Sequence, residues 1–284
     1  MKCAWQAYLN LLPIWLRKDV DKLGREHLQE LRMRIGRPPE LVTRKGTIRI
    51  DGTVNSDDLN FCINAASRYS PWASTTVRYG YITAIGGHRV GICGEVAIVN
   101  NQVTTITNIT SLCIRVARDF PELAIDLKDL PGSVLLIGPP GSGKTTLLRD
   151  LIRQKSNYGY GPIAVVDERK EIFPVSEDSF CFSPGMSTEV ISGCNKAKGL
   201  EILVRTMTPR WIAVDEVTAA EDSEALVHSG WCGVSLIATA HANDLNDLKS
   251  RPVYHPLVES GLFDSVIVLG LDKSWKLERM NICK

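Results

Sequence analysis

Five short and mostly apolar runs divide the second half of the chain, at residues 134–137, 163–166, 211–214, 234–239 and 265–269. Apolar and polar residues hardly alternate within them, which is typical of parallel strands buried on both faces. Segments that favour helices lie between several of these runs, at residues 145–154, 196–207 and 220–227. Alternation of strand and helix builds a parallel sheet covered by helices. The pattern therefore predicts an α/β domain over residues 131–284, beginning at Pro131-Gly132.

The pattern of residues 1–130 is different and predicts a smaller α+β domain with an antiparallel sheet. Leu23, Leu28 and Leu31 recur among charged neighbours at a helical spacing, and residues 57–68 also favour a helix. Short runs with turn residues around them indicate strands at residues 47–50, 79–90, 91–99 and 103–106. Three dipeptides typical of turns follow or interrupt these runs: Asp51-Gly52, Gly86-Gly87 and Asn100-Asn101.

The composition mainly argues against certain kinds of partner and site. Hydrophobic residues make up 44% and charged residues 23% of the 284 residues, as in ordinary soluble proteins, and the net charge is +1. A near-neutral chain has no overall basic field that would attract nucleic acid or anionic lipid. The eight cysteines form no CxxC pair, so neither a zinc site nor a disulfide framework is expected. We expect a cytoplasmic protein.

The N-terminal segment 5–16 is apolar but contains Pro13 and is too short to span a bilayer. We expect it to form a helix that packs on its own domain. Docking to a membrane surface or to a partner is the alternative interpretation.

The clearest chemical motif is a phosphate-binding loop directly after the run at 134–137. Residues 138–145 match GxxxxGK[ST] in full. Glycines let successive backbone N–H groups point at phosphate oxygens, and the following helix adds its positive end. Lys144 supplies a mobile charge for the β- and γ-phosphates, and the Thr145 hydroxyl can bind Mg²⁺. The motif thus predicts ATP and Mg²⁺ as cofactors. The predicted nucleotide-binding residues are Gly138, Pro139, Pro140, Gly141, Ser142, Gly143, Lys144, Thr145 and Thr146.

Acidic residues end two of the predicted strands, where a parallel sheet presents its ligands. Asp215 is expected to bind Mg²⁺, with Thr145, and Glu216 to orient or deprotonate the attacking water. Asp167 and Glu168 end the strand that follows the P-loop helix and are expected beside the γ-phosphate. Plain helix capping, for the first pair, and a salt-bridged loop, for the second, are the structural alternatives.

His241 follows a third predicted strand, the apolar run at residues 234–239. It is expected to sense the γ-phosphate, although a histidine at a strand end is more often structural.

The order of these motifs resembles the secretion-type AAA-like ATPases that power type II and type IV secretion and pilus machines. That group has a P-loop, an acidic box, a Walker B strand and a histidine box, matched here by residues 138–145, 167–171, 211–216 and 239–241. Within the group, residues 31–41, 80–94 and 165–172 resemble the stage III sporulation AA family. The resemblance implies a hexameric ATPase ring in the mother-cell cytoplasm of endospore-forming bacteria. It also implies a location at the inner face of a membrane complex, driving membrane-embedded channel proteins between mother cell and forespore.

The resemblance further implies arginines that reach the site of a neighbouring subunit. Arg78, Arg89 and Arg115 are the favoured candidates, and Arg118 is a fourth. One position departs from the group, because Thr218-Ala219 replaces the Gly-Arg expected after the Walker B acids. That departure places one contact between subunits in doubt.

Three other functions remain open at this point. A single-stranded nucleic-acid-binding ATPase could use the basic cluster of Arg32, Arg34, Arg37, Arg44 and Lys45. The near-zero net charge argues against it, and we expect no nucleic-acid partner. A small-molecule kinase shares the P-loop but needs an acceptor pocket and an arginine-rich lid, and a nucleotide-binding scaffold would lack hydrolysis.

Overall fold

The structure, a computed structural model, describes the whole chain except residues 69–76, 78–79, 100–101, 177–178 and 281–284. Contacts between Cα atoms divide it into two compact units. Unit 1 is Met1–Asp119 with Pro174–Phe182, and unit 2 is Phe120–Phe173 with Ser183–Lys284. The sequence pattern suggested a boundary near residue 131, whereas residues 120–130 lie in unit 2. They are held there because the backbone N–H groups of Glu122 and Ala124 donate to the buried carboxylate of Asp150.

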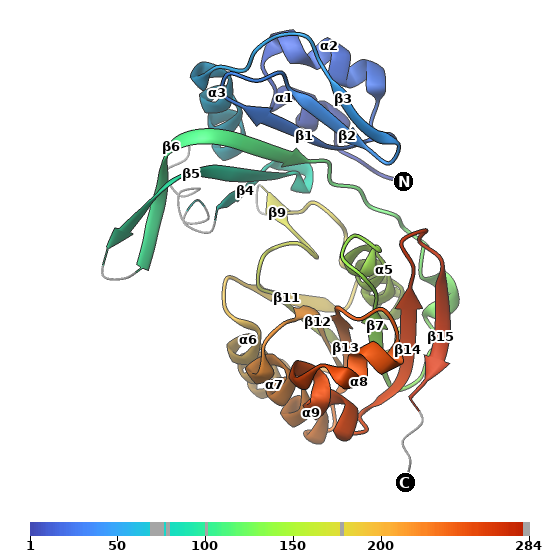
Figure 1. The fold of residues 1–284 in the computed structure, drawn as a ribbon. Coiled ribbons are helices and arrows are strands. Elements are labelled where there is room, and N and C mark those ends of the chain that lie inside the picture. The colour runs from blue at the N-terminus through green and yellow to red at the C-terminus, as the bar shows by residue number, and fades with distance from the viewer. Residues whose placement is uncertain (69–76, 78–79, 100–101, 177–178, 281–284) are drawn as a thin grey trace. The chain divides into compact units, whose positions relative to one another are not determined.

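Unit 1 contains a six-stranded antiparallel sheet with the strand order β3-β2-β1-β6-β5-β4 (Figure 1). The strands are β1 (Leu28–Arg34), β2 (Glu40–Thr43), β3 (Gly46–Arg49), β4 (Tyr81–Thr83), β5 (Arg89–Val99) and β6 (Gln102–Arg115). The helices are α1 (Trp5–Asn10), α2 (Ile14–Leu23) and α3 (Ser56–Ser67). Helix α3 begins at a capping box of Asn55 and Asp58, which confirms the helix predicted at 57–68.

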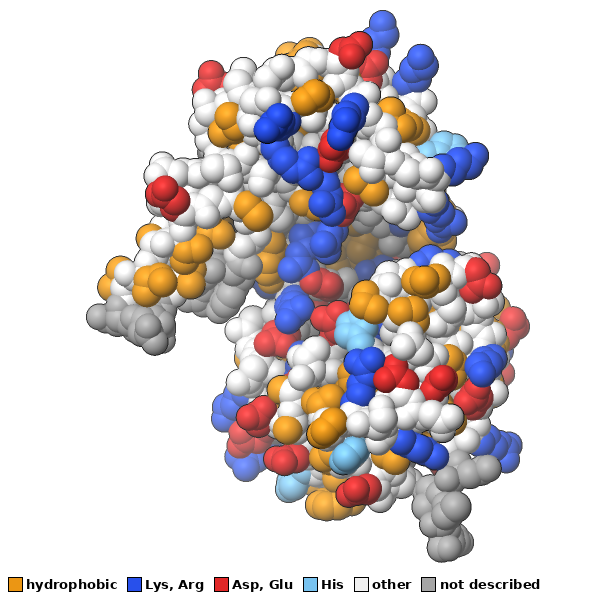
Figure 2. Space-filling model, in the orientation of Figure 1, with side chains coloured by type: hydrophobic (Ala, Val, Ile, Leu, Met, Phe, Trp, Pro, Cys, Tyr) orange, Lys and Arg blue, Asp and Glu red, His pale blue; other side chains and the backbone are white. Residues whose placement is uncertain are grey.

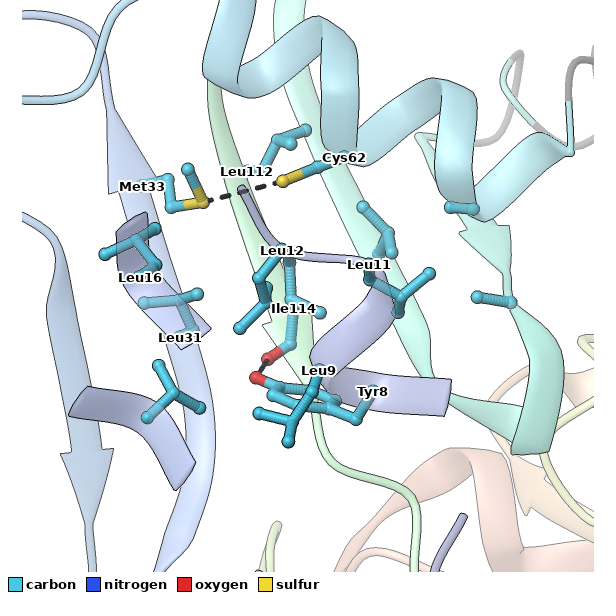
Figure 3. Packing of buried hydrophobic residues seen from close by; sticks show 14 of the residues in the cluster. Tyr8, Leu9, Leu11, Leu12, Leu16, Leu31, Met33, Cys62, Leu112 and Ile114 are labelled. Carbon is cyan, nitrogen blue, oxygen red and sulfur yellow. Dashed lines mark hydrogen bonds between the residues drawn. The ribbon is translucent and has the colours of Figure 1, made fainter. Parts of the chain in front are cut away.

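The N-terminal segment supplies much of the core of unit 1. Tyr8, Leu12 and Leu16 are fully buried, and the Tyr8 hydroxyl donates to the carbonyl oxygen of Ile114 at 3.0 Å (Figure 3). The prediction that this segment packs on its own domain is confirmed.

Two local predictions for unit 1 were wrong. Leu28 and Leu31 lie in β1, not in a helix, because a bulge between Leu28 and Glu30 turns two residues three apart toward the same core. Asp51-Gly52 does not connect two strands, since the hairpin turn falls between Thr43 and Gly46. Gly52 is needed for another reason: a Cβ atom there would meet the Trp15 ring at 2.8 Å.

The run at 79–90 is divided in two. A 3-10 turn η2 (Ile85–Gly87) separates β4 from β5, with Gly86 at φ 76°, and confirms the turn predicted there. Residue 79 and Asn100-Asn101 lie outside the described residues. Beyond its pairing with β1 and β4, the β5–β6 hairpin exposes several apolar side chains, visible as orange atoms in Figure 2; they include Val96, Ile98, Val99 and Val103.

The segment Pro174–Phe182 lies between the two sequence segments of unit 2 but folds as part of unit 1. It forms the two-stranded sheet of β9 (Val175–Ser176) and β10 (Ser179–Phe180). A Cβ atom on Gly87 would meet Pro174 at 2.9 Å, so a glycine allows this segment to pack closely.

Unit 2 contains a seven-stranded sheet in the order β11-β8-β12-β13-β7-β14-β15, parallel except for the edge strand β15 (Figure 1). The strands are β7 (Ser133–Ile137), β8 (Ile163–Asp167), β11 (Thr188–Ser192), β12 (Trp211–Val217), β13 (Ser235–Ala240), β14 (Phe263–Leu269) and β15 (Trp275–Arg279). All five predicted strands are present. The edge strands β11 and β15 were not predicted, because partly exposed strands lack the continuous apolar run.

Helices cover both faces of this sheet. They are α5 (Lys144–Asn157), α6 (Lys196–Met207), α7 (Ala220–Trp231), α8 (Leu245–Ser250) and α9 (His255–Glu259), with 3-10 turns η3 (Ile125–Leu127) and η4 (Pro252–Tyr254). Helix α5 packs on one face, while α6, α7 and α9 share a core with the other. This is the α/β architecture that the sequence predicted, beside the smaller α+β unit. Among the described helices, none has both the length and the apolar character needed to cross a membrane.

Candidate active site

The P-loop (residues 138–145) joins β7 to α5. Gly141 and Gly143 have φ values of 76° and 101°, a left-handed backbone that glycine adopts at little cost. A Cβ atom on Gly138 would approach the carbonyl oxygen of Leu269 to 2.7 Å. The loop geometry therefore requires glycine at these positions, as in loops whose successive backbone N–H groups bind an anion.

Lys144 lies inside this loop and is only 5% exposed. Its ammonium donates to the carbonyl oxygens of Gly138 at 2.8 Å and Pro139 at 3.0 Å. Burial lowers the pKa of Lys144, although the charges of Asp215 and Glu216 oppose the shift. The four other predicted residues of the loop region differ in exposure: Ser142 is buried, Thr145 and Thr146 are half-buried and Pro140 is exposed.

Asp215 and Thr145 are far apart in sequence but meet beside the loop. The Thr145 hydroxyl donates to Asp215 Oδ2 at 2.6 Å, and the Thr239 hydroxyl donates to Asp215 Oδ1 at 2.5 Å. Mg²⁺ prefers oxygen ligands and is usually held by one or two carboxylates together with substrate phosphates. The paired hydroxyl and carboxylate of Thr145 and Asp215 fit that ion.

Glu216 occupies an unusual backbone conformation for a residue with a side chain. Its φ is 55°, within a bulge where the register of β12 against β13 shifts between Val214 and Val217. The Glu216 N–H donates to the Thr239 hydroxyl at 2.7 Å, which holds the kink. Left-handed backbone costs a non-glycine residue about 1–2 kcal/mol, and such outliers collect at functional sites.

His241 connects Glu216 to the P-loop lysine. His241 Nε2 lies 2.9 Å from Glu216 Oε1, and Nδ1 lies 3.0 Å from Lys144 Nζ. An ammonium can only donate, so Nδ1 accepts from Lys144 and Nε2 carries the proton that is donated to Glu216. Burial raises the pKa of Glu216, but the hydrogen bond from His241, with the charges of Arg169 and Lys144, brings it below its ordinary value. Glu216 is therefore ionised at neutral pH.

Asp167 ends β8 and organises the loop that follows it. Its carboxylate accepts hydrogen bonds from the backbone N–H groups of Glu171 at 2.8 Å, Ile172 at 3.1 Å and Phe173 at 2.7 Å. From the other side, the Arg149 guanidinium donates to the carbonyl oxygens of Glu171 and Ile172. Burial raises the pKa of Asp167 to about 6, against the effect of these N–H donors. The geometry gives Asp167 a positioning role, and direct catalysis by it stays a prediction.

Glu168 faces a different network. Lys196 Nζ lies 2.6 Å from Glu168 Oε2 and 3.6 Å from Asp222 Oδ2. The Asp222 carboxylate in turn accepts from the backbone N–H groups of Thr218 and Ala219, each at 3.3 Å. Ala219 is the N-cap residue of α7 and its side chain caps nothing, so this helix start has only the half of a capping box that Asp222 supplies. The pocket beside these acids is lined by Asp167, Glu168, Arg169, Lys196, Asp215 and Glu216, among others.

The described candidate arginines, Arg89, Arg115 and Arg118, belong to unit 1. Arg89 lies over the Tyr81 ring at 3.9 Å from its centroid, and Arg115 forms a 3.7 Å ion pair with Glu30. Arg118 donates to the carbonyl oxygens of Arg25 and Leu28, so it serves the fold of its own unit. Arg78 lies outside the described residues. A contact of any of these arginines with a neighbouring subunit stays a prediction.

Several residues of the site were not assigned a role from sequence. The roles of Arg149, Lys196 and Tyr254 follow from tertiary contacts that no local pattern signals; the Tyr254 hydroxyl accepts from the His241 N–H at 3.0 Å. Thr239 left a signal, because it is a polar residue in an apolar strand and is the first residue of the predicted histidine box. Lys273, whose ammonium donates to the carbonyl oxygen of Gly141 in the P-loop, left a weaker signal within the turn-forming sequence Asp-Lys-Ser.

The sequence comparisons agree with these motifs. The family model described as "Sporulation stage III, protein AA" matches residues 5–277. The chain belongs to this family. It is 36% identical over 258 residues to the stage III sporulation protein AA of Bacillus subtilis (strain 168), covering 87% of this chain and 83% of that protein.

Solved structures share the fold at low sequence identity. The pilus retraction motor PilT with bound ADP matches with a TM-score of 0.62 and 15% identity, over 96% of this chain and 84% of that chain. The ATPase DotB of Legionella pneumophila matches with a TM-score of 0.56 and 17% identity, over 94% of this chain and 80% of that chain. This chain thus has the fold of secretion-type P-loop ATPases, as the sequence predicted.

Proposed function

We propose that this chain hydrolyses ATP in the presence of Mg²⁺. The observation that carries the proposal is one connected set of contacts around the P-loop. Thr145 bonds to Asp215, Lys144 bonds to His241, and His241 bonds to Glu216. An ammonium, a hydroxyl–carboxylate pair and an ionised glutamate within reach of one phosphate cradle are the parts that phosphoryl transfer to water needs.

Each residue has a role in this proposal. The P-loop N–H groups and Lys144 bind the phosphates, and Thr145 and Asp215 would hold Mg²⁺, which neutralises charge on the phosphate oxygens. Glu216 accepts the proton of the attacking water. Lys144 donates to two loop carbonyl oxygens and to His241, so a phosphate that binds Lys144 would replace one of these acceptors. If it replaces His241, the imidazole that donates to Glu216 loses its other partner.

At the level of the cell, we propose a motor of the sporulation machinery. Support comes from membership of the stage III sporulation AA family and from the fold shared with DotB and PilT. The motor would be a homo-hexamer at the cytoplasmic face of a membrane complex in the mother cell, acting on membrane-embedded channel proteins. Unit 1 would serve assembly and would supply arginines such as Arg89 or Arg115 to the next subunit.

Glu216→Gln tests the chemistry. The amide keeps the shape and can still bond to His241, but it cannot take a proton. Turnover of MgATP should fall by about 10² to 10⁴, while ATP binding stays within a few-fold of the parent. Glu224→Gln, an exposed change of the same kind on α7, is the matched control and should leave turnover unchanged.

Two results would count against the proposal. Unchanged turnover in Glu216→Gln would remove Glu216 from the mechanism, and failure of the parent protein to bind ATP would remove the function itself. Light scattering after size exclusion, with and without a non-hydrolysable ATP analogue, tests the hexamer.

A further inference from the structure

The turn between β14 and β15 lies directly against the P-loop. The carbonyl oxygen of Leu269, at the end of β14, stands 2.7 Å from where a Cβ on Gly138 would be. Four residues further on, the Lys273 ammonium donates to the carbonyl oxygen of Gly141. The Cδ atom of Lys273 lies 3.7 Å from the Cβ position of Gly143. The Lys273 side chain therefore runs along the loop rather than out from the turn.

The turn itself does not account for a lysine at this position. The Lys273 N–H closes the turn by donating to Gly270 at 3.1 Å, and Asp272 Oδ1 accepts from the N–H and hydroxyl of Ser274. Lys273 has φ 73°, a left-handed conformation in which glycine or asparagine is favoured in hairpin loops. A glycine at this position would suit the backbone but could not make the side-chain contact with the P-loop that Lys273 makes.

Lys273 also bears on the charge of the site. Burial is the main cause that lowers the pKa of Lys144, and the positive charge of Lys273 acts in the same direction. Two ammonium groups at one loop repel each other. A polyphosphate bound there would be attracted by both, so the repulsion would give way to favourable contacts.

Sheet order indicates which phosphates Lys273 reaches. Asp215 and Glu216 follow β12, and His241 follows β13, on one side of β7. Lys273 comes from the β14–β15 turn, on the opposite side of β7. Lys144 points toward His241, and in P-loops this lysine serves the β- and γ-phosphates while the loop backbone cradles the α- and β-phosphates. The γ-phosphate end thus belongs on the β13 side and the rest of the nucleotide on the β14 side.

We propose that Lys273 binds the α- and β-phosphates of the bound nucleotide, as a second cation on the side of the P-loop opposite the catalytic acids. The proposal rests on the proposed ATPase function and extends the nucleotide site to the C-terminal hairpin. Lys273 is assigned to binding, not to the hydrolytic step.

Lys273→Gly separates this binding role from the fold, because glycine suits φ 73° and keeps the turn. Affinities for ADP and for a non-hydrolysable ATP analogue are measured by titration calorimetry, and stability by urea denaturation without nucleotide. We expect stability equal to or above the parent and a Kd raised about tenfold for both nucleotides, with kcat within about threefold at saturation. Lys273→Arg keeps the charge and should bind within about threefold of the parent. Lys276→Gln, on the adjacent strand β15, is the control for loss of a lysine from this hairpin.

Each contrary outcome has a distinct meaning. If the parent binds neither nucleotide, the proposed function fails. If the parent binds and Lys273→Gly binds equally well, only the role of Lys273 fails. A tighter Kd in Lys273→Gly would make Lys273 a group that obstructs the loop, and a loss confined to the ATP analogue would place it at the γ-phosphate; both overturn the assignment.

Discussion

Thr239 is the residue whose replacement tests the geometry of the site most directly. It is fully buried at the end of β13, and its hydroxyl serves two partners at once. It donates to Asp215 at 2.5 Å and accepts from the backbone N–H of Glu216 at 2.7 Å. One oxygen atom thus fixes the orientation of one acid and the backbone kink of the next. Thr239→Val replaces that hydroxyl by a methyl group of nearly the same size.

The expected loss can be worked out from these two bonds. A hydrogen bond to a charged group contributes about 1.5–3 kcal/mol, and an unpaired buried donor costs about 1–3 kcal/mol. Asp215 keeps its bond to Thr145 and the Glu216 N–H is only partly buried, so the lower parts of both ranges apply. We expect Thr239→Val to lower the free energy of unfolding by about 2–4 kcal/mol, a large share of the roughly 5–15 kcal/mol of a typical domain.

Thr239→Ser is the matched control. It keeps the hydroxyl and removes a buried methyl group, which costs about 1 kcal/mol. Urea unfolding of both variants, followed by steady-state MgATP turnover under conditions where both are folded, checks the reasoning. Turnover should fall at least tenfold in Thr239→Val and stay within a few-fold in Thr239→Ser. Equal stability and equal turnover of the two variants would show that the hydroxyl positions neither acid.

Two further predictions concern backbone strain and buried charge. The free energy of unfolding of Glu216→Gly should be about 1 kcal/mol higher than that of Glu216→Ala. Both variants lack the carboxylate, and only alanine is strained at φ 55°. Equal denaturation midpoints of the two variants would contradict the presence of strain. Burial lowers the pKa of Lys155 to about 8 from 10.5, so between these pH values the unfolded chain holds a proton that the folded protein has lost. The free energy of unfolding should therefore rise with pH across that window, by about 2 kcal/mol more in the parent than in Lys155→Met; parallel pH profiles would refute it.

The parallel sheet and the P-loop could be predicted from sequence because their signals are local. Five apolar runs gave five strands, and the glycines and Lys144 stand in one continuous motif. The acids at 167, 215 and 216 could also be identified from the sequence as site candidates, because the carboxyl ends of strands in a parallel sheet share one edge. Unit 1 was harder to predict. Its strands are antiparallel, and a single bulge in β1 gave Leu28 and Leu31 the spacing of a helix.

Partner choice within the site could not be predicted, because it depends on tertiary distances. Asp167 and Glu168 are adjacent in sequence, yet one accepts three backbone N–H groups and the other meets Lys196. The conformation of the loop after β8 decides which of the two acids accepts the backbone N–H groups. Arg149 on α5 stabilises that conformation by donating to the carbonyl oxygens of Glu171 and Ile172. No pattern in the sequence of α5 distinguishes Arg149 from the other charged residues of that helix.

The strand order explains why β13 carries the connecting residues. In the order β12-β13-β7, strand β13 lies between the strand that ends in Asp215-Glu216 and the strand that leads to the P-loop. Thr239 is the last residue but one of β13, and His241 directly follows the strand, so both lie at this end of it. Thr239 accordingly bonds to Asp215 and to the Glu216 backbone, and His241 bonds to Glu216 and to Lys144. In the proposed mechanism, a phosphate that binds Lys144 would compete with its three present acceptors, of which His241 is one, and loss of that contact would reach Glu216 through the imidazole ring.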